Sequence, residues 1–103
     1  MTQRESRLSR KIIQRLQQEF GQKIFCFKVW GNEHQLAGVP DIIGCIKGLF
    51  FGLETKLPET RTKVSQRQEL THIWIRQGGG FVRVVTSVEE GLQAIYDLLS
   101  EKS

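Results

Sequence analysis

The central part of the chain, residues 38–56, has the sequence GVPDIIGCIKGLFFGLETK. It contains two runs rich in β-branched and aromatic residues, and only Lys47 and Gly48 separate them. Two such runs joined by two residues are typical of a β-hairpin. We therefore expect antiparallel strands over residues 39–46 and 49–56.

The register of this hairpin places acidic residues together. If Ile46 faces Leu49 across the turn, Asp41 lies directly opposite Glu54, and directly opposed side chains share one face of a sheet. Lys56 lies two residues beyond Glu54, so it points to the same face. The opposite face is apolar, so we expect it to face the core. It consists of Ile42, Gly44, Ile46, Leu49, Phe51 and Leu53. Two acids and a lysine are thus expected to converge at one end of the hairpin.

Two carboxylates at this distance repel each other unless a proton or a cation neutralises them. Mg²⁺ suits such a pair, because it takes one or two protein carboxylates and keeps waters and phosphate oxygens as its other ligands. A lysine beside the pair could orient a water or counter charge that develops on phosphate. The alternative interpretation is a surface hairpin in which Glu54 and Lys56 form a solvated ion pair.

The remaining segments predict a small α/β domain. Apolar residues at helical or strand-like spacing predict helices over 5–20, 65–77 and 88–99, and strands over 24–30 and 81–86. Ser87 and Glu90 predict a capping box at the start of the last helix. The order α-β-β-β-α-β-α indicates one domain over residues 1–103, with a mixed central sheet flanked by helices.

Glu5 is predicted on the core-facing side of the first helix, in line with its apolar stripe of Leu8, Ile12, Leu16 and Phe20. An inward carboxylate at this helix end could add a third acid to the site. The alternative is a helix-start glutamate that is favoured by the helix dipole.

The 103 residues include 15 Lys or Arg, 11 Asp or Glu and 39% apolar residues, with a formal net charge of +4. This composition argues against disordered and disulfide-dense classes. No apolar run approaches the roughly 18 residues of a membrane span, and no signal-peptide core follows the start, so we expect a cytoplasmic protein without membrane association. Seven of the bases lie in residues 1–28, which favours an anionic partner such as nucleic acid.

In this order the motifs resemble the PD-(D/E)xK nuclease superfamily and, more closely, its virus-type replication–repair (VRR-NUC) branch. Residues 38–41 match Gly-x-Pro-Asp, and residues 54–56 match Glu-x-Lys. The fuller pattern adds an N-terminal helical Glu, a Gln that opens the next helix, a glycine-rich break and a Val-Val strand. The resemblance covers nearly the whole chain and implies a restriction-endonuclease-like α-β-β-β-α-β core.

The resemblance also implies roles for individual residues. Asp41 and Glu54 would hold Mg²⁺ or Mn²⁺, Lys56 would be the catalytic lysine, and Glu5 would be a further metal or water ligand. Gln68 would be a motif residue near the site. How many metal ions bind stays open.

The activity implied is that of a metal-dependent endonuclease that hydrolyses phosphodiester bonds in branched DNA such as Holliday junctions. Small stand-alone members of this type act as homodimers, and a bacterial or phage origin is expected. Flaps, nicks and single strands are alternative substrates. A non-catalytic DNA-binding subunit, or a dimeric interaction module whose charges only specify strand register, are alternative functions.

For Gln68 the sequence leaves two interpretations, because Ser65 and Gln68 also form a Ser-x-x-Gln capping box. His34 and His72 are interpreted as ordinary residues rather than ligands, although His34 could contact a phosphate.

Two pairs of residues are given structural rather than catalytic interpretations. Trp30 and Trp74 could stack on bases or pack at a dimer interface, with core or half-exposed packing as the simpler interpretation. Cys26 and Cys45 have no metal-type spacing and are interpreted as buried free thiols.

Overall fold

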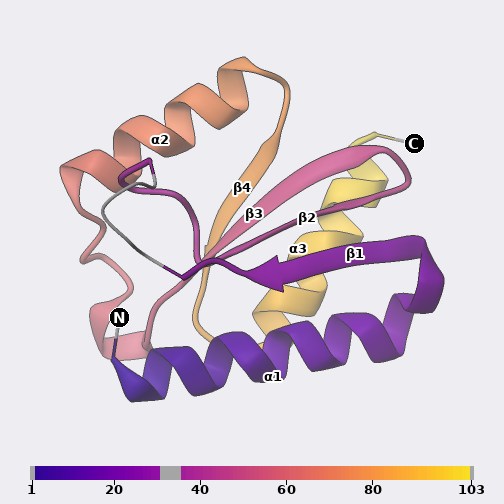
Figure 1. Cartoon of the computed structure of the whole chain (residues 1–103), viewed down its shortest axis with the longest axis horizontal. Helices are drawn as coiled ribbons and strands as arrows, with labels where there is room; N and C mark the ends of the chain where they lie inside the picture. Colours follow the sequence, from indigo (N-terminus) through magenta and orange to yellow (C-terminus); the bar gives the residue numbers. More distant parts are fainter. Residues whose placement is uncertain (1, 31–35, 103) are drawn as a thin grey trace.

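The protein is described by a computed structural model that covers residues 2–30 and 36–102. Along the chain the elements are α1 (Gln3–Phe20), η1 (Gly21–Lys23), β1 (Ile24–Lys28), β2 (Ile42–Ile46), β3 (Leu49–Thr55), η2 (Pro58–Thr60), α2 (Gln66–Gln77), β4 (Phe81–Val85) and α3 (Val88–Glu101). The strands lie in the order β1-β2-β3-β4, antiparallel except for the parallel pair β3 and β4 (Figure 1). The expected α/β class and mixed sheet are confirmed.

The helices divide between the two faces of the sheet. Apolar residues of α1 and α3 pack together against one face and form the core, which includes Ile12, Leu16, Phe51, Leu53, Val85, Ile95 and Leu98. Helix α2 lies apart from these two helices, against β4 (Figure 1). Because successive side chains of a strand point to opposite faces, the even-numbered residues of β3 face away from the core and towards α2.

The central hairpin has the expected register. Ile46 pairs with Leu49, and the ladder continues to the pair of Ile42 and Leu53. Lys47 and Gly48 form the turn with φ angles of 51° and 80°, as a type I′ turn requires. Positive φ at both positions matches the right-handed twist of the two strands, so the turn itself determines which residues face each other.

Several expected boundaries differ from the structure. The strand expected over 39–46 begins only at Ile42, and the strand expected over 24–30 ends at Lys28. Pro40 lacks the N–H group that a ladder needs, and Ala37 and Gly38 before it form a turn, so the ladder starts only at Ile42. Helix α1 begins earlier than expected, because Thr2 caps it and accepts a hydrogen bond from the backbone N–H of Glu5.

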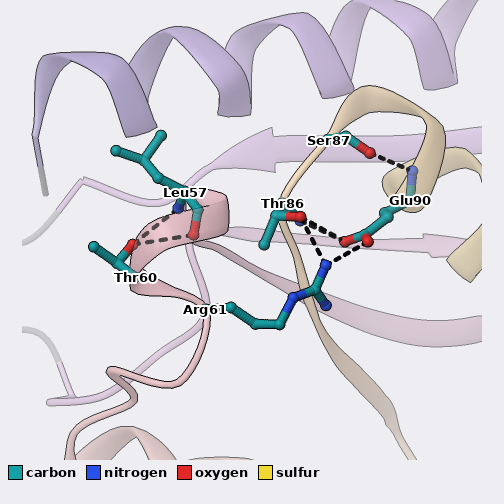
Figure 2. A network of polar contacts seen from close by, with 6 residues as sticks. All are labelled: Leu57, Thr60, Arg61, Thr86, Ser87 and Glu90. Atoms are coloured by element: carbon teal, nitrogen blue, oxygen red, sulfur yellow. Dashed lines mark hydrogen bonds and ion pairs between the residues drawn. The ribbon is translucent and has the colours of Figure 1, made fainter.

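The expected capping box of α3 forms only in part. Ser87 accepts a hydrogen bond from the backbone N–H of Glu90, but the Glu90 carboxylate turns to Thr86 and Arg61 instead of to the cap. The Arg61 guanidinium donates to Thr86 Oγ1 at 2.8 Å and to Glu90 Oε2 at 2.5 Å (Figure 2). Thr60 accepts from the backbone N–H of Leu57 in the same region. These bonds tie the connection that follows Lys56 to the start of α3.

One further expectation about burial is corrected. Cys45 is exposed, whereas Cys26 is buried as expected, because Cys45 points to the side of the sheet that α1 and α3 do not cover. Trp30 and Trp74 are 59% and 57% exposed, which excludes core packing and agrees with the half-exposed interpretation. None of the helices in the described ranges is long and apolar enough to cross a membrane.

Candidate active site

The structure brings Asp41 and Glu54 together, although not as a regular cross-strand pair. Asp41 lies one residue before β2, beyond the last ladder pair, and its Oδ2 accepts the backbone N–H of Thr55 at 2.8 Å. Glu54 lies in β3 and is 1% exposed. The hairpin register therefore predicts the neighbourhood correctly, while a side-chain-to-backbone hydrogen bond sets how the Asp41 carboxylate is turned.

The backbone around Asp41 is held on two sides. Its carbonyl accepts the N–H of Val29 at 2.7 Å, which links the end of β1 to this connection. Pro40 packs flat on β3 at Gly52, where an added Cβ would lie only 2.8 Å from Pro40 Cγ. Glycine at position 52 therefore lets the proline approach the sheet and place the next residue beside Glu54.

The electrostatics of the pair are those of two carboxylates removed from water. Burial and the neighbouring Glu54 carboxylate raise the pKa of Asp41 to about 8, against the effect of the Thr55 N–H and of Lys28. Burial also raises the pKa of Glu54, although its interaction with Asp41 and the charge of Lys56 oppose the rise. Without a cation, the pair therefore retains a proton near neutral pH.

Lys56 follows β3 directly. Its backbone N–H donates to the carbonyl of Val85 at 3.0 Å, which extends the parallel pairing with β4 by one residue. The positive charge of its side chain lowers the pKa of Glu54, so it acts on the acidic pair. The structure thus places the expected acids and lysine in one region at the carboxyl end of β3.

Glu5 is buried at the start of α1, as expected from its position on the core-facing stripe. Its side chain closes a capping box by accepting the N–H of Thr2 at 3.1 Å, a structural task that the sequence interpretation missed. Its charge contributes to the raised pKa of Glu54. Within residues 2–30 and 36–102, no group of three or more His, Cys, Asp or Glu side chains is placed to hold a metal ion, so Glu5 does not join Asp41 and Glu54 in a three-residue ligand group.

Gln68 performs both tasks that the sequence left open. Its Oε1 accepts the N–H of Ser65 at 2.9 Å and completes the capping box of α2. Its Nε2 donates to Glu54 Oε2 at 3.2 Å. The amide is well suited to this double contact, because it carries an acceptor and a donor on the same group.

His72 lies in the same place, one turn after Gln68, and sequence reasoning had interpreted it as an ordinary residue. It is 4% exposed, and its Nε2 lies 3.7 Å from Glu54 Oε1. Burial and the charge of Arg76 lower its pKa, so the imidazole is neutral. Its helical spacing from Gln68 was the available signal, but the sequence alone did not show that this face of α2 points inward.

Contacts to the connection before Asp41 determine the position of α2. Gly38 has a φ of 82°, and a Cβ there would lie 2.4 Å from the carbonyl oxygen of Arg67. Thr71 Oγ1 donates to the carbonyl of Ala37 at 2.8 Å. The glycine of the Gly-x-Pro-Asp motif is thus required where the backbone meets α2, and this contact brings the helix next to the acids.

Basic and aromatic side chains lie on the segments next to Asp41 and Lys56. The Trp30 ring lies under two cations, with Lys28 Nζ at 4.2 Å and Arg10 Cζ at 5.6 Å from its centroid. A shallow pocket beside the connection that follows Lys56 is lined by Arg4, Arg7, Leu8, Lys11 and Leu57. His34, for which a phosphate contact was considered, lies outside the described residues.

Comparison with known proteins supports the fold assignment. A solved structure described as "VRR_NUC domain" matches this chain with a TM-score of 0.71 and 24% sequence identity, over 92% of this chain and 97% of that one. No family model matches the sequence, and no curated protein does. The chain therefore has the nuclease-type fold of a VRR-NUC domain, a mixed four-stranded sheet flanked by helices.

Proposed function

We propose that this protein is a metal-dependent DNA endonuclease, with Asp41, Glu54 and Lys56 at its active site. The observation that carries the proposal is the buried carboxylate pair beside a lysine at the end of β3. Burial raises the pKa of both acids, and the Glu54 carboxylate raises that of Asp41 further; burying two acids side by side is unfavourable for a purely structural hairpin. Functional sites are where such arrangements are found.

The residues present fit Mg²⁺ or Mn²⁺. Hard divalent cations take oxygen ligands, and Mg²⁺ is commonly held by one or two carboxylates plus waters and substrate phosphates. Asp41 and Glu54 would hold the ion, and Glu5 would contact it through water. The fit is supported by the raised pKa of Asp41, since a cation would relieve the repulsion that a proton otherwise relieves. A bound ion would supply positive charge at the phosphate and acidify a bound water.

The chain's own residues would carry out the remaining tasks. The Lys56 ammonium would orient the attacking water and counter the negative charge that grows on the phosphate. Gln68 would keep the Glu54 carboxylate turned towards the site, through the bond to Oε2 at 3.2 Å. The Thr55 N–H would do the same for Asp41.

The DNA backbone would approach along α1. The pocket formed by Arg4, Arg7 and Lys11 continues into the connection that carries Lys56. Trp30 with its two cations directly follows Val29, whose N–H donates to the Asp41 carbonyl. Phosphates in the pocket and a base or sugar on Trp30 would place the backbone between them across the acids, and such contacts are salt-dependent.

We further propose that the substrate is branched DNA and that the protein acts as a homodimer. Six side chains that are 41–64% exposed support a dimer: Phe25, Phe27, Phe50, Leu70, Ile73 and Trp74. At about 100 Å² each they offer roughly 600 Å² of apolar surface per copy, close to the roughly 800 Å² per partner of a standard interface. Two active sites in one dimer would suit a junction that has two strands to cut.

The test is cleavage by the purified protein of a labelled panel: a four-way junction, a flap, a nicked duplex, a linear duplex and a single strand. We expect cleavage with Mg²⁺ or Mn²⁺, fastest on the four-way junction, and none in EDTA. Asp41→Asn and Lys56→Ala should each lower the rate by about 100-fold or more. Asn is preferred to Ala at position 41 because its amide oxygen can still accept the Thr55 N–H.

Full activity in either variant would overturn the assignment of the site. Salt-sensitive DNA binding without cleavage of any substrate would instead favour a non-catalytic DNA-binding subunit. An equal rate on all branched and linear substrates would leave the nuclease in place and overturn the preference for junctions.

A further inference from the structure

Two side chains of α2, Gln68 and His72, lie next to the carboxylate of Glu54. Gln68 Nε2 donates to Glu54 Oε2 at 3.2 Å, and His72 Nε2 lies 3.7 Å from Glu54 Oε1. Gln68 and His72 are four residues apart, so both project from the same face of the helix. The two oxygens of Glu54 therefore each face a different residue of α2.

The contact between His72 and Glu54 is incomplete. Among residues 2–30 and 36–102, neither Glu54 Oε1 nor His72 Nε2 has a hydrogen-bond partner, and both atoms are fully buried. A buried polar atom without a partner costs free energy, and native proteins rarely leave two of them facing each other. A histidine that only filled space would more often bond to a nearby backbone carbonyl.

The position of α2 is determined independently of this pair. Gly38 meets the backbone of Arg67, and Thr71 bonds to the carbonyl of Ala37. These contacts come from the connection that carries Asp41, so α2 is placed by the same segment that builds the site. A shift of less than about 1 Å would bring Nε2 within hydrogen-bond distance of Oε1.

We infer that His72 is a positioning residue for Glu54: its Nε2–H donates to Oε1 while Gln68 holds Oε2. The inference rests on the proposed function, since it concerns the carboxylate that would bind the divalent cation. Each carboxylate oxygen can accept in two directions, so both contacts leave Glu54 free to bind an ion. Residues that orient a metal-binding side chain in this way commonly contribute 10- to 100-fold to metal affinity.

The experiment measures Mn²⁺ binding to the full chain without DNA by isothermal titration calorimetry, together with thermal melting in EDTA. His72→Leu keeps the bulk and removes the donor, whereas His72→Gln keeps a donor that can reach Oε1. We expect the Leu variant to raise the Kd for Mn²⁺ by about 10-fold or more and the Gln variant to stay within about 3-fold of the wild type. In EDTA the Leu variant should melt at nearly the same temperature as the wild type, because the buried leucine side chain gains apolar contact that offsets the lost donor to Oε1.

Leu98→Ala is the stability control. Leu98 is 1% exposed and belongs to the core of α1, α3 and the sheet, on the opposite face of the sheet from His72. This variant should melt at a lower temperature while its Kd for Mn²⁺ stays unchanged. A structural role of His72 would give the same pattern as the control, so the two variants separate positioning from packing.

Equal Mn²⁺ affinity of the wild type and His72→Leu would overturn the inference and leave the proposed nuclease intact. A directly bound imidazole nitrogen in pulsed EPR of the Mn²⁺ complex would also overturn it, since His72 would then be a ligand. No Mn²⁺ binding by the wild type would remove the proposed metal site and the inference with it. If His72→Leu does not fold, His72→Asn replaces it, because its shorter amide cannot reach Oε1.

Discussion

At the scale of single residues, the site combines side chains that each have a structural partner as well as a proposed role. Asp41 accepts a backbone N–H of β3, Glu5 closes the cap of α1, and Gln68 closes the cap of α2. These bonds hold each group in one orientation before any substrate arrives. Such preorganisation is what an active site requires, and it explains why a capping interpretation and a functional one need not compete.

The proton that Asp41 retains leads to a prediction about pH. Its pKa is about 8 in the folded protein against 3.8 for an ordinary Asp, so the folded state binds a proton that the unfolded chain has released. Between these two pKa values the free energy of unfolding is therefore highest at the low-pH end and falls as the pH rises towards 8. We expect the Tm of the metal-free wild type to fall between about pH 4 and about pH 8.

Asp41→Asn removes the titrating group but keeps the acceptor. At about pH 8 in EDTA its Tm should exceed that of the wild type by about 5–10 °C. Mg²⁺ should raise the Tm of the wild type and leave that of the variant nearly unchanged. Scanning calorimetry across the pH range measures both effects, and parallel pH profiles for the two proteins would contradict the prediction.

At the scale of the elements, the placement of α2 decides which residues join the site. Helical spacing places Gln68, His72 and Ile75 on one face of this helix and the apolar Leu70, Ile73 and Trp74 on the other. The spacing alone does not show which face is inward, although the family resemblance favours the Gln68 face. The structure places the mixed polar face against the sheet. The physical reason lies outside the helix, in the close contact at Gly38.

Gly38→Ala tests this contact. Its Cβ would lie 2.4 Å from the Arg67 carbonyl oxygen, at a φ that L residues rarely adopt. We expect a loss of about 2–4 kcal/mol in the free energy of unfolding and weaker Mn²⁺ binding, because α2 must move away from Glu54.

Gly48→Ala is the control for Gly38→Ala. It has a similar φ of 80° but nothing within 4 Å of its added Cβ, so it should cost only about 1–2 kcal/mol and leave Mn²⁺ affinity unchanged. Urea denaturation and calorimetry measure the two quantities. Equal effects of both variants on Mn²⁺ binding would show that the contact with Arg67 does not position the site.

The helices α1 and α3 illustrate how packing corrects a sequence pattern. Helical spacing gives α3 an apolar stripe of Val88, Leu92, Ile95 and Leu99, but its most buried positions are Gly91, Ala94, Ile95 and Leu98. At Gly91 an added Cβ would lie 2.8 Å from Ile12 Cγ2. Small residues allow the two helices to approach, and hydrophobicity alone does not identify them as contact positions.

At the scale of the whole molecule, the most informative feature is that α2 covers only part of one face of the sheet. Helix α2 lies over β4 and leaves the outer side of β1 and β2 open (Figure 1). Phe25, Phe27 and Phe50 are exposed there, and Leu70, Ile73 and Trp74 line the outer side of α2. A twofold axis could place α2 of one copy on the exposed face of β1 and β2 of the other, and the reverse contact would form by symmetry. This is the self-complementary geometry of an isologous dimer.

If the protein forms the proposed dimer through this surface, a charged substitution there should dissociate it. Phe25 lies on the strand part of this surface and Ile73 on the α2 part. Phe25→Asp and Ile73→Asp should each yield a monomer in size-exclusion chromatography coupled to light scattering. Cys26→Asp would not be informative, because Cys26 belongs to the core. Tyr96→Asp is a suitable control, since Tyr96 is similarly exposed but lies on α3. A monomeric wild type, or dimers in both surface variants, would contradict this interface.

The sequence by itself determined the α/β order, the hairpin register and the meeting of Asp41 with Glu54, because turn chemistry and the two-residue period of strands are local. It also indicated the inward side of Glu5 from helical spacing. Only the tertiary structure decided which face of α2 meets the sheet, and with it the contact of Gln68 and His72 with Glu54. It also decided the exposure of Cys45 and both tryptophans. These features depend on contacts between segments far apart in the chain, where steric fit at Gly38, Gly52 and Gly91 prevails over local preference.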